Sequence, residues 1–157
     1  MACEQAPDAA PAGVNGPCYA ISGINSGAWP AEYAAISALP QPSRVPAVQA
    51  FYEEHFWNDW LVQLDSDDLA KRVFDFAVNG GAGTAVMTMQ RAVNSLGGSL
   101  TVDGGWGPLT VAAANAADQE ALVQAFIAAR AAHYRAIAAA NPADAKFLRQ
   151  WLARAES

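Results

Sequence analysis

The sequence is poor in positive charge. It has nine Lys and Arg residues against fifteen Asp and Glu, for a net charge of −6 and a pI near 4.7. Nucleic acids and anionic membrane surfaces are bound through basic surfaces, so the composition argues against both as partners. The same deficit gives no long-range attraction toward an anionic polymer, and binding one would require a local groove.

Cysteine and histidine are also scarce, with two of each in 157 residues. Cys3 and Cys18 do not form a CxxC spacing, which leaves a disulfide formed after export or two free thiols; free thiols suit a cytosolic product. Neither His55 nor His133 has a second histidine or cysteine at i+3 or i+4. The sequence therefore predicts no metal site and no cofactor.

Long apolar runs are missing as well. No stretch reaches the length of a membrane-spanning helix without Gly, Pro or charge, and "MACEQAPDAAPAGVNG" has neither the basic nor the apolar region of a signal peptide. We therefore expect no membrane insertion. We also expect synthesis in the cytoplasm without a signal peptide, and action outside the cell only after release by another agent.

Apolar residues are plentiful at 53% of the chain, enough for a sizeable core in a single domain spanning residues 1–157. Residues 1–43 hold six of the nine prolines and are expected to be irregular. Within them "CYAISGINSG" predicts a short strand or turn pair, and "WPAEYAAISAL" one short helix. Residues 44–157 follow helical periodicity, so the predicted fold class is mainly α.

Several helix boundaries can be placed from capping residues. Ser66 precedes an acidic first turn and is a good N-cap, and Gly80-Gly81 ends the same helix. Pro108 stands near the first position of a later helix, and Asp118 caps the long Ala-rich helix after it. A last helix is expected from about Pro142 to Ala155.

Asp75 and Asn79 lie four residues apart in "VFDFAVNGG" and therefore share one helix face. A core helix needs neither residue there. In the local interpretation, Asn79 caps the helix end and Asp75 pairs with Lys71 or Arg72. In the functional interpretation, the two polar groups border a binding cleft.

A second polar motif is "TVDGGWGPLT". Asp103 begins a tight glycine-rich turn, in which backbone N–H groups commonly hold the carboxylate. Trp106 in the same turn either fills a gap or meets a ligand. Trp57 and Trp60, three residues apart, either line a sugar cleft or pack in the core.

Together these motifs resemble a known family. "AFYEEHFWNDWLVQL" followed by "DDLAKRVFDFAVNGGAGTAVMTMQRAVN" resembles the family 108 glycoside hydrolases, N-acetylmuramidases with a lysozyme-like, mostly helical fold. Their pattern has an aromatic helix, then "FDxAVNxG", then an "LQRALN"-like helix. "LTVDGGWGPLTVAAAN" resembles the "VDGxxGPxT" turn of that family's C-terminal peptidoglycan domain. The resemblance covers roughly residues 48–155, and the combination is more specific than any one motif.

The resemblance implies a lysozyme-like helical domain acting on peptidoglycan glycan strands, with residues 44–157 corresponding to the peptidoglycan-targeting region. In such enzymes the "FDxAVN" helix borders the sugar cleft. Asn79 would then bind substrate or orient a catalytic group, and Asp75 would brace the wall. The implied substrate contacts are Tyr52, Trp57, Asp103 and Trp106.

The implied general acid is Glu4. The family places this Glu in an "EGGY" motif upstream of a "TxYGIT" segment, for which "CYAIS" stands here. Glu4 lies near the corresponding distance, but no "GGY" follows it and only three residues precede it. A glycosidase acid requires a raised pKa, which depends on burial. Alternatives without a supporting motif are Glu32, Glu53 and Glu54.

Two functions follow as hypotheses. The first is a muramidase that cuts peptidoglycan, released by a phage holin or borne on a virion, with action at the periplasmic cell wall. The second is a catalytically degenerate module on the same fold, which binds peptidoglycan or serves as a structural subunit of a phage or secretion apparatus. The intact "FDFAVNGG" favours the enzyme, and the poor motif around Glu4 favours the module.

Overall fold

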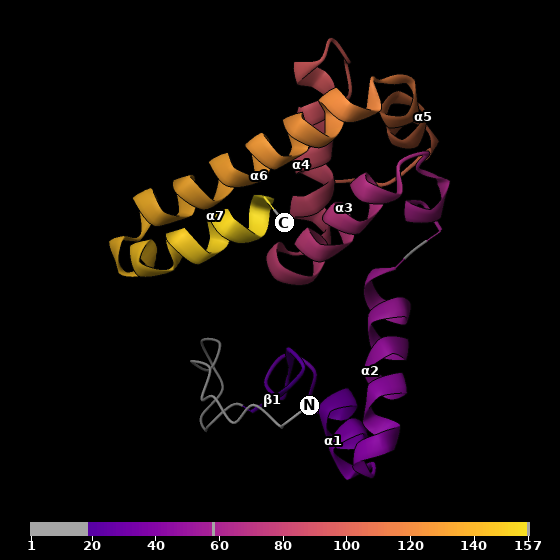
Figure 1. The fold of residues 1–157 in the computed structure, drawn as a ribbon, viewed down its shortest axis with the longest axis vertical. Coiled ribbons are helices and arrows are strands. Elements are labelled where there is room, and N and C mark those ends of the chain that lie inside the picture. Colours follow the sequence, from indigo (N-terminus) through magenta and orange to yellow (C-terminus); the bar gives the residue numbers. More distant parts are fainter. Residues whose placement is uncertain (1–18, 58, 157) are drawn as a thin grey trace. The chain divides into compact units, whose positions relative to one another are not determined.

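The computed structural model describes residues 19–57 and 59–156, and its architecture is mainly α, as expected from the sequence (Figure 1). The chain forms two compact units, residues 1–55 and residues 56–157. Each unit is described by itself. The expectation of one lysozyme-like domain over residues 1–157 stays a prediction.

The first unit opens with a β-hairpin. Strands β1 (Ala20–Ile21) and β2 (Ile24–Asn25) pair antiparallel, which confirms the strand or turn pair expected at this point. The two loop residues, Ser22 and Gly23, have φ values of +50° and +87°, as in the turns that match the twist of a hairpin. The hydroxyl of Tyr52 donates to the carbonyl of Ser22 at 2.7 Å and ties the hairpin to the next helix pair.

Two helices complete this unit. Helix α1 (Pro30–Ala38) is the short helix expected from the sequence, and α2 (Gln41–Phe56) begins inside the segment that was expected to be irregular. The ring of Trp29 lies 5.0 Å from Phe51 and 4.7 Å from His55. His55 therefore belongs to a local aromatic cluster within its own unit.

The elements of the second unit are all helices in the part that the structure describes. Its elements are η1 (Leu61–Gln63), α3 (Asp67–Gly80), α4 (Ala82–Ser95), α5 (Pro108–Ala116), α6 (Gln119–Ala140), η2 (Pro142–Phe147) and α7 (Leu148–Glu156). The expected caps are confirmed, because Ser66 accepts from the N–H of Leu69 and Asp118 accepts from the N–H of Ala121. The last helix differs from expectation: after Asn141 the chain makes 3₁₀ turns before α7 begins.

The core of this unit lies between α3, α4 and α6. Phe76, Met89 and Phe126 come from these three helices and are fully buried. Gly80 is required by this packing, because a Cβ there would lie 2.5 Å from the ring of Phe76. Helices α6 and α7 run side by side, and the end of α7 returns to α3 (Figure 1). None of the described helices has both the length and the apolar character needed to cross a membrane.

Candidate functional site

Asp75 joins three helices through two arginines. Arg130 of α6 donates from Nη2 to Asp75 Oδ2 at 2.5 Å, and Arg154 of α7 donates from Nη2 to Asp75 Oδ1 at 2.8 Å. These partners are 55 and 79 residues away in sequence. The expected local pairing with Lys71 or Arg72 is therefore wrong: Arg72 pairs instead with Asp68, at 3.1 Å, one turn earlier on α3.

Arg130 is almost completely buried, with 2% of its side chain exposed. Its guanidinium lies 5.0 Å from the centre of the Phe76 ring and 5.6 Å from that of Tyr134, a stacked arrangement that suits a weakly hydrated cation. Such a buried charge requires a partner, and Asp75 supplies it. Burial opposes ionisation of Asp75, but hydrogen bonds from Arg154 and Arg130 outweigh it and hold its pKa below the ordinary value.

Asn79 lies one turn beyond Asp75, on the same face of α3. Its Nδ2 donates to the carbonyl of Asp75 at 2.6 Å, and its distance to Asp75 Oδ1 is 3.4 Å. The side chain is thus oriented by a bond back into its own helix, consistent with part of the local interpretation. It is nevertheless exposed, and it lines a pocket.

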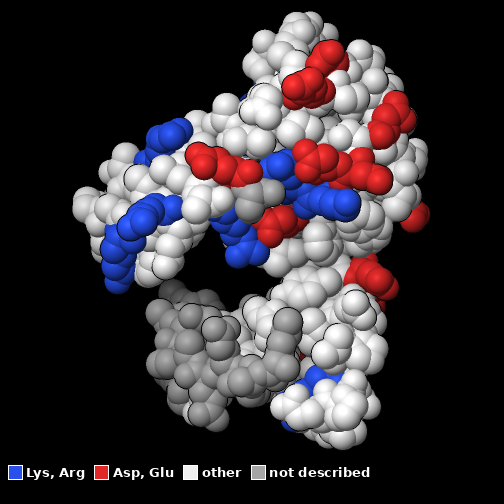
Figure 2. Space-filling view, viewed as in Figure 1, with Lys and Arg blue, Asp and Glu red and all other residues white. Residues whose placement is uncertain are grey.

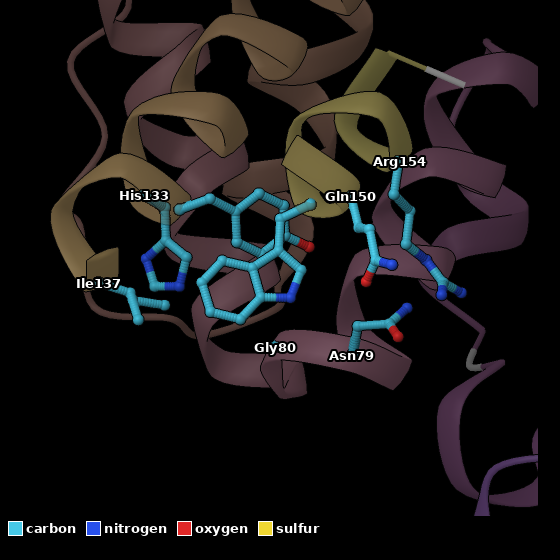
Figure 3. Close-up of a pocket in the computed structure, with 8 residues that line it drawn as sticks. Asn79, Gly80, His133, Ile137, Gln150 and Arg154 are labelled. Carbon is cyan, nitrogen blue, oxygen red and sulfur yellow. The ribbon is translucent and has the colours of Figure 1, made fainter. Parts of the chain in front are cut away.

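The pocket has a volume of about 510 Å³ and lies between the end of α3, the second half of α6, and α7 (Figure 3). Asn79, Gln150 and Arg154 gather toward one end of it, and His133 and Ile137 lie at the other. The full lining is Asn79, Gly80, His133, Tyr134, Ile137, Gln150, Trp151 and Arg154.

Aromatic rings give the pocket a flat apolar wall. Tyr134 and Trp151 stack with centroids 5.6 Å apart and ring planes 26° apart. His133 adds a third ring; burial, aided by the nearby charge of Arg91, lowers its pKa and so disfavours the charged imidazolium. The permanent cation among the lining residues is Arg154, and no Asp or Glu belongs to this lining.

The "VDGGWG" motif is built differently, because its polar groups bond to one another. Gln90 of α4 is buried and donates from Nε2 to Asp103 Oδ1 at 2.9 Å and to the carbonyl of Gly105 at 3.2 Å. The backbone N–H groups of Asp103 and Gly104 donate to Gln90 Oε1 at 3.1 and 3.0 Å. The hydrogen bond from Gln90, with that from the N–H of Gly105, lowers the pKa of Asp103.

The loop before this turn is fixed in the same way. Asn94 donates from Nδ2 to the carbonyl of Leu100 at 2.8 Å and accepts from the N–H of Leu100 at 2.7 Å. Gly104 packs so closely on α4 that a Cβ would lie 3.0 Å from the carbonyl oxygen of Gly83. Trp106 is partly buried against the core. Gln90 and Asn94, both part of the family resemblance, thus hold the loop.

The other predicted contacts lie outside the pocket. Tyr52 belongs to the first unit and holds its hairpin. Trp57 is 36% exposed and packs edge-on against Phe74 at 5.3 Å. Asp103 and Trp106 lie in the turn described above. Their roles as substrate contacts stay predictions.

The expected general acid lies outside the described residues, as do both cysteines; they are Glu4, Cys3 and Cys18. Among the alternatives, Glu53 and Glu54 are exposed on α2, and Glu32 is partly exposed on α1. In residues 19–57 and 59–156, no group of three or more His, Cys, Asp or Glu side chains is placed to hold a metal ion.

Sequence reasoning missed most of the pocket. The contributions of Tyr134, Gln150, Trp151 and Arg154 to a pocket were not anticipated. One signal was available: Gln150 and Arg154 are four residues apart and so share a face, with Trp151 adjacent. Their convergence with Asn79 depends on the tertiary return of α7 to α3, which no local pattern encodes.

Comparison with known proteins is informative for the second unit. No curated protein matches the chain. Residues 84–156 match the model of a family described as a predicted peptidoglycan domain. The match runs from the first turn of α4 to the end of α7, and it includes the Gln90–Asp103 turn and six of the eight pocket-lining residues. These residues therefore form a peptidoglycan-related domain, which indicates a peptidoglycan-associated role for the protein.

Proposed function

We propose that the protein binds peptidoglycan and that the pocket between α3, α6 and α7 is its binding site. The observation that carries this proposal is that the peptidoglycan-related segment contributes six of the eight residues lining the pocket. The remaining two, Asn79 and Gly80, come from the helix end that the sequence had singled out.

The chemistry of the pocket suits an acetamido sugar. A pyranose ring presents an apolar face of C–H groups, which packs on an aromatic surface such as the partly exposed ring of Trp151, supported from behind by the buried Tyr134. The amides of Asn79 and Gln150 offer donors and acceptors for hydroxyl and acetamido groups. Few, well-placed polar groups beside an apolar wall are typical of ligand sites.

A pelleting assay on purified sacculi tests the proposal. We expect the wild-type protein to sediment with the sacculi and Trp151→Ala to lose at least about tenfold in affinity, because the stacking surface is removed. The matched control is Trp57→Ala, which deletes an equally large, exposed ring outside the pocket. Loss of binding in Trp57→Ala with retention in Trp151→Ala would move the site away from this pocket.

Cleavage of the glycan strand is the second candidate function. It is favoured by Asn79, the residue that the resemblance places beside a sugar cleft, because Asn79 lines the pocket. A muramidase also requires a carboxyl group that donates a proton. Asp75 does not fit that role, since its arginine partners lower its pKa. The acid that the resemblance implies is Glu4, and the proposed enzyme would be released by a holin or carried on a phage particle.

Muropeptide release from Gram-negative peptidoglycan tests this candidate, with wild type, Glu4→Gln and Asn79→Ala compared. Release by wild type that disappears in Glu4→Gln would support a muramidase with Glu4 as its acid. Release that survives in Glu4→Gln would direct the search to Glu32, Glu53 and Glu54. Pelleting without release would leave a binding module. If the protein does not pellet with sacculi and releases no muropeptides, both functions are contradicted.

A further inference from the structure

We propose that the pocket recognises the peptide stem of peptidoglycan through a carboxylate, and not the glycan alone. This inference rests on the proposed function and names the part of the polymer that the site selects. Peptidoglycan presents two chemistries: neutral acetamido sugars, and short peptides attached to them that carry free carboxylates. The pocket residues discriminate between these two chemistries.

The lining of the pocket carries positive charge only. Arg154 is its permanent cation, and the lining includes no Asp or Glu. The carboxylate of Asp75 that pairs with Arg154 is shared with Arg130, so the three groups together carry one net positive charge. Half of the Arg154 side chain is exposed, so a ligand can approach it from solvent. A guanidinium has five N–H donors in a planar fork. In Arg154 the Nε and Nη2 groups bond to Asp75, and the same planar geometry suits the carboxylate of a ligand. A site for a neutral sugar needs no such group.

The charges of the second unit are unevenly distributed, with an excess of positive charge on the helices that form most of the pocket. From α6 to the end of the chain there are five Lys or Arg residues against three Asp or Glu, whereas residues 56–118 contain three against seven. In Figure 2 most acidic side chains gather over the α3–α5 side, and basic side chains extend over the α6–α7 side. The chain is acidic as a whole, but the helices that form most of the pocket are basic, and this supplies the local attraction that the net charge lacks.

Arg154 is also held in place before any ligand arrives. Its Nε and Nη2 bond to the carboxylate of Asp75, which Arg130 fixes from the buried side. Preorganisation of this kind reduces the entropy lost on binding. Because Asn79 and Gln150 lie toward the same end of the pocket, the anionic end of a ligand would meet Arg154 while its sugar meets the rings (Figure 3).

Two soluble ligands test the inference: a muropeptide disaccharide carrying its peptide, and the same disaccharide with its lactyl carboxyl capped as a simple amide, which carries no carboxylate. Affinities are measured by calorimetry on the full chain. We expect the wild-type protein to bind the peptide-bearing ligand at least about tenfold more tightly, with the difference shrinking as salt concentration rises. Arg154→Gln should bind both ligands equally, and Arg154→Lys should keep part of the preference. Arg149→Gln, an equal loss of charge on an exposed part of α7 outside this pocket, should keep all of it.

The outcomes separate this inference from the proposed function. If the wild-type protein binds both ligands equally and still sediments with sacculi, the inference is overturned but peptidoglycan binding is kept. A preference that Arg154→Gln retains would overturn it as well. Sacculi that fail to sediment the protein would contradict the proposed function itself. Circular dichroism checks that Arg154→Gln keeps its helices; if it does not, the wild-type comparison and Arg154→Lys decide.

Discussion

Two polar clusters in the second unit differ in where their hydrogen bonds go. Gln90 and Asn94 of α4 bond to the loop between α4 and α5, and the amide groups of both side chains are used within the fold. Asn79 and Gln150 lie beside an open pocket, and among the described residues Asn79 bonds back to Asp75 of its own helix. We call these the closed cluster and the open cluster.

The difference shows how similar residues acquire different tasks. A buried amide must be hydrogen-bonded, so the closed cluster specifies the shape of a loop and has little left to offer a ligand. An exposed amide beside aromatic rings keeps its bonding capacity for a ligand. Stability should therefore depend mainly on the closed cluster, and peptidoglycan binding mainly on the open one.

Two glutamine substitutions should show the largest difference between the clusters. Gln90→Ala should lower the free energy of unfolding by about 3 kcal/mol, because it truncates a buried side chain and leaves the part-buried N–H groups of Asp103 and Gly104 without their acceptor. Gln150→Ala, on the exposed face of α7, should change it by less than about 0.5 kcal/mol and weaken sacculus binding instead. Denaturant unfolding measures the first effect and pelleting the second; equal stability losses would remove the distinction.

Asp75 supports the open cluster, because its ion pair with Arg154 holds α7 beside the pocket. Asp75→Asn should cost about 2 kcal/mol, because Arg130 stays buried without its counter-charge. This free-energy cost is smaller than that of breaking a fully buried ion pair, because 35% of the Asp75 side chain is exposed and solvent screens its charge. Arg72→Gln, which breaks only the exposed pair with Asp68, is the control and should cost well under 1 kcal/mol.

The difference in unfolding free energy between wild type and Asp75→Asn should change with pH in a defined direction. A carboxyl whose pKa is lower in the folded state binds fewer protons there, so its stabilisation is complete above the ordinary value of 3.8. It is lost as the pH falls from that value through the lower folded value. The gap in unfolding free energy between wild type and Asp75→Asn should therefore narrow below about pH 4 and stay constant above about pH 5. A gap that is unchanged at pH 2 would mean that the ion pairs contribute nothing.

The closed cluster also depends on backbone geometry. Gly104 has φ +74° and a Cβ there would approach the carbonyl oxygen of Gly83 to 3.0 Å, so Gly104→Ala should cost about 1–2 kcal/mol. Gly83→Ala is the matched control, because its Cβ would meet no atom within 4 Å and alanine is the better helix former. Thermal unfolding should show a lower Tm for the first variant and an equal or higher Tm for the second.

The sequence predicted local features better than it predicted the site. Ser66, Asp118 and Pro108 act within one helical turn, so their positions identified helix starts that the structure has. The pairing of Asp75 was predicted wrongly because its partners approach only through tertiary packing. Trp151 looks like any core residue of an amphipathic helix, and its contribution to a pocket depends on Tyr134 across the helix pair.

Two asparagine substitutions should have the smallest effects and should separate stability from binding most selectively. Asn94→Ala removes two hydrogen bonds that hold Leu100, and should cost about 1 kcal/mol while leaving sacculus binding unchanged at temperatures where the protein is folded. Asn79→Ala removes a single local bond from an exposed side chain and should cost less than about 0.5 kcal/mol, yet it should weaken binding severalfold. Because both residues belong to the same sequence resemblance, only their surroundings separate them. A binding loss in Asn94→Ala as large as that in Asn79→Ala would show that the glycine-rich loop itself contacts peptidoglycan.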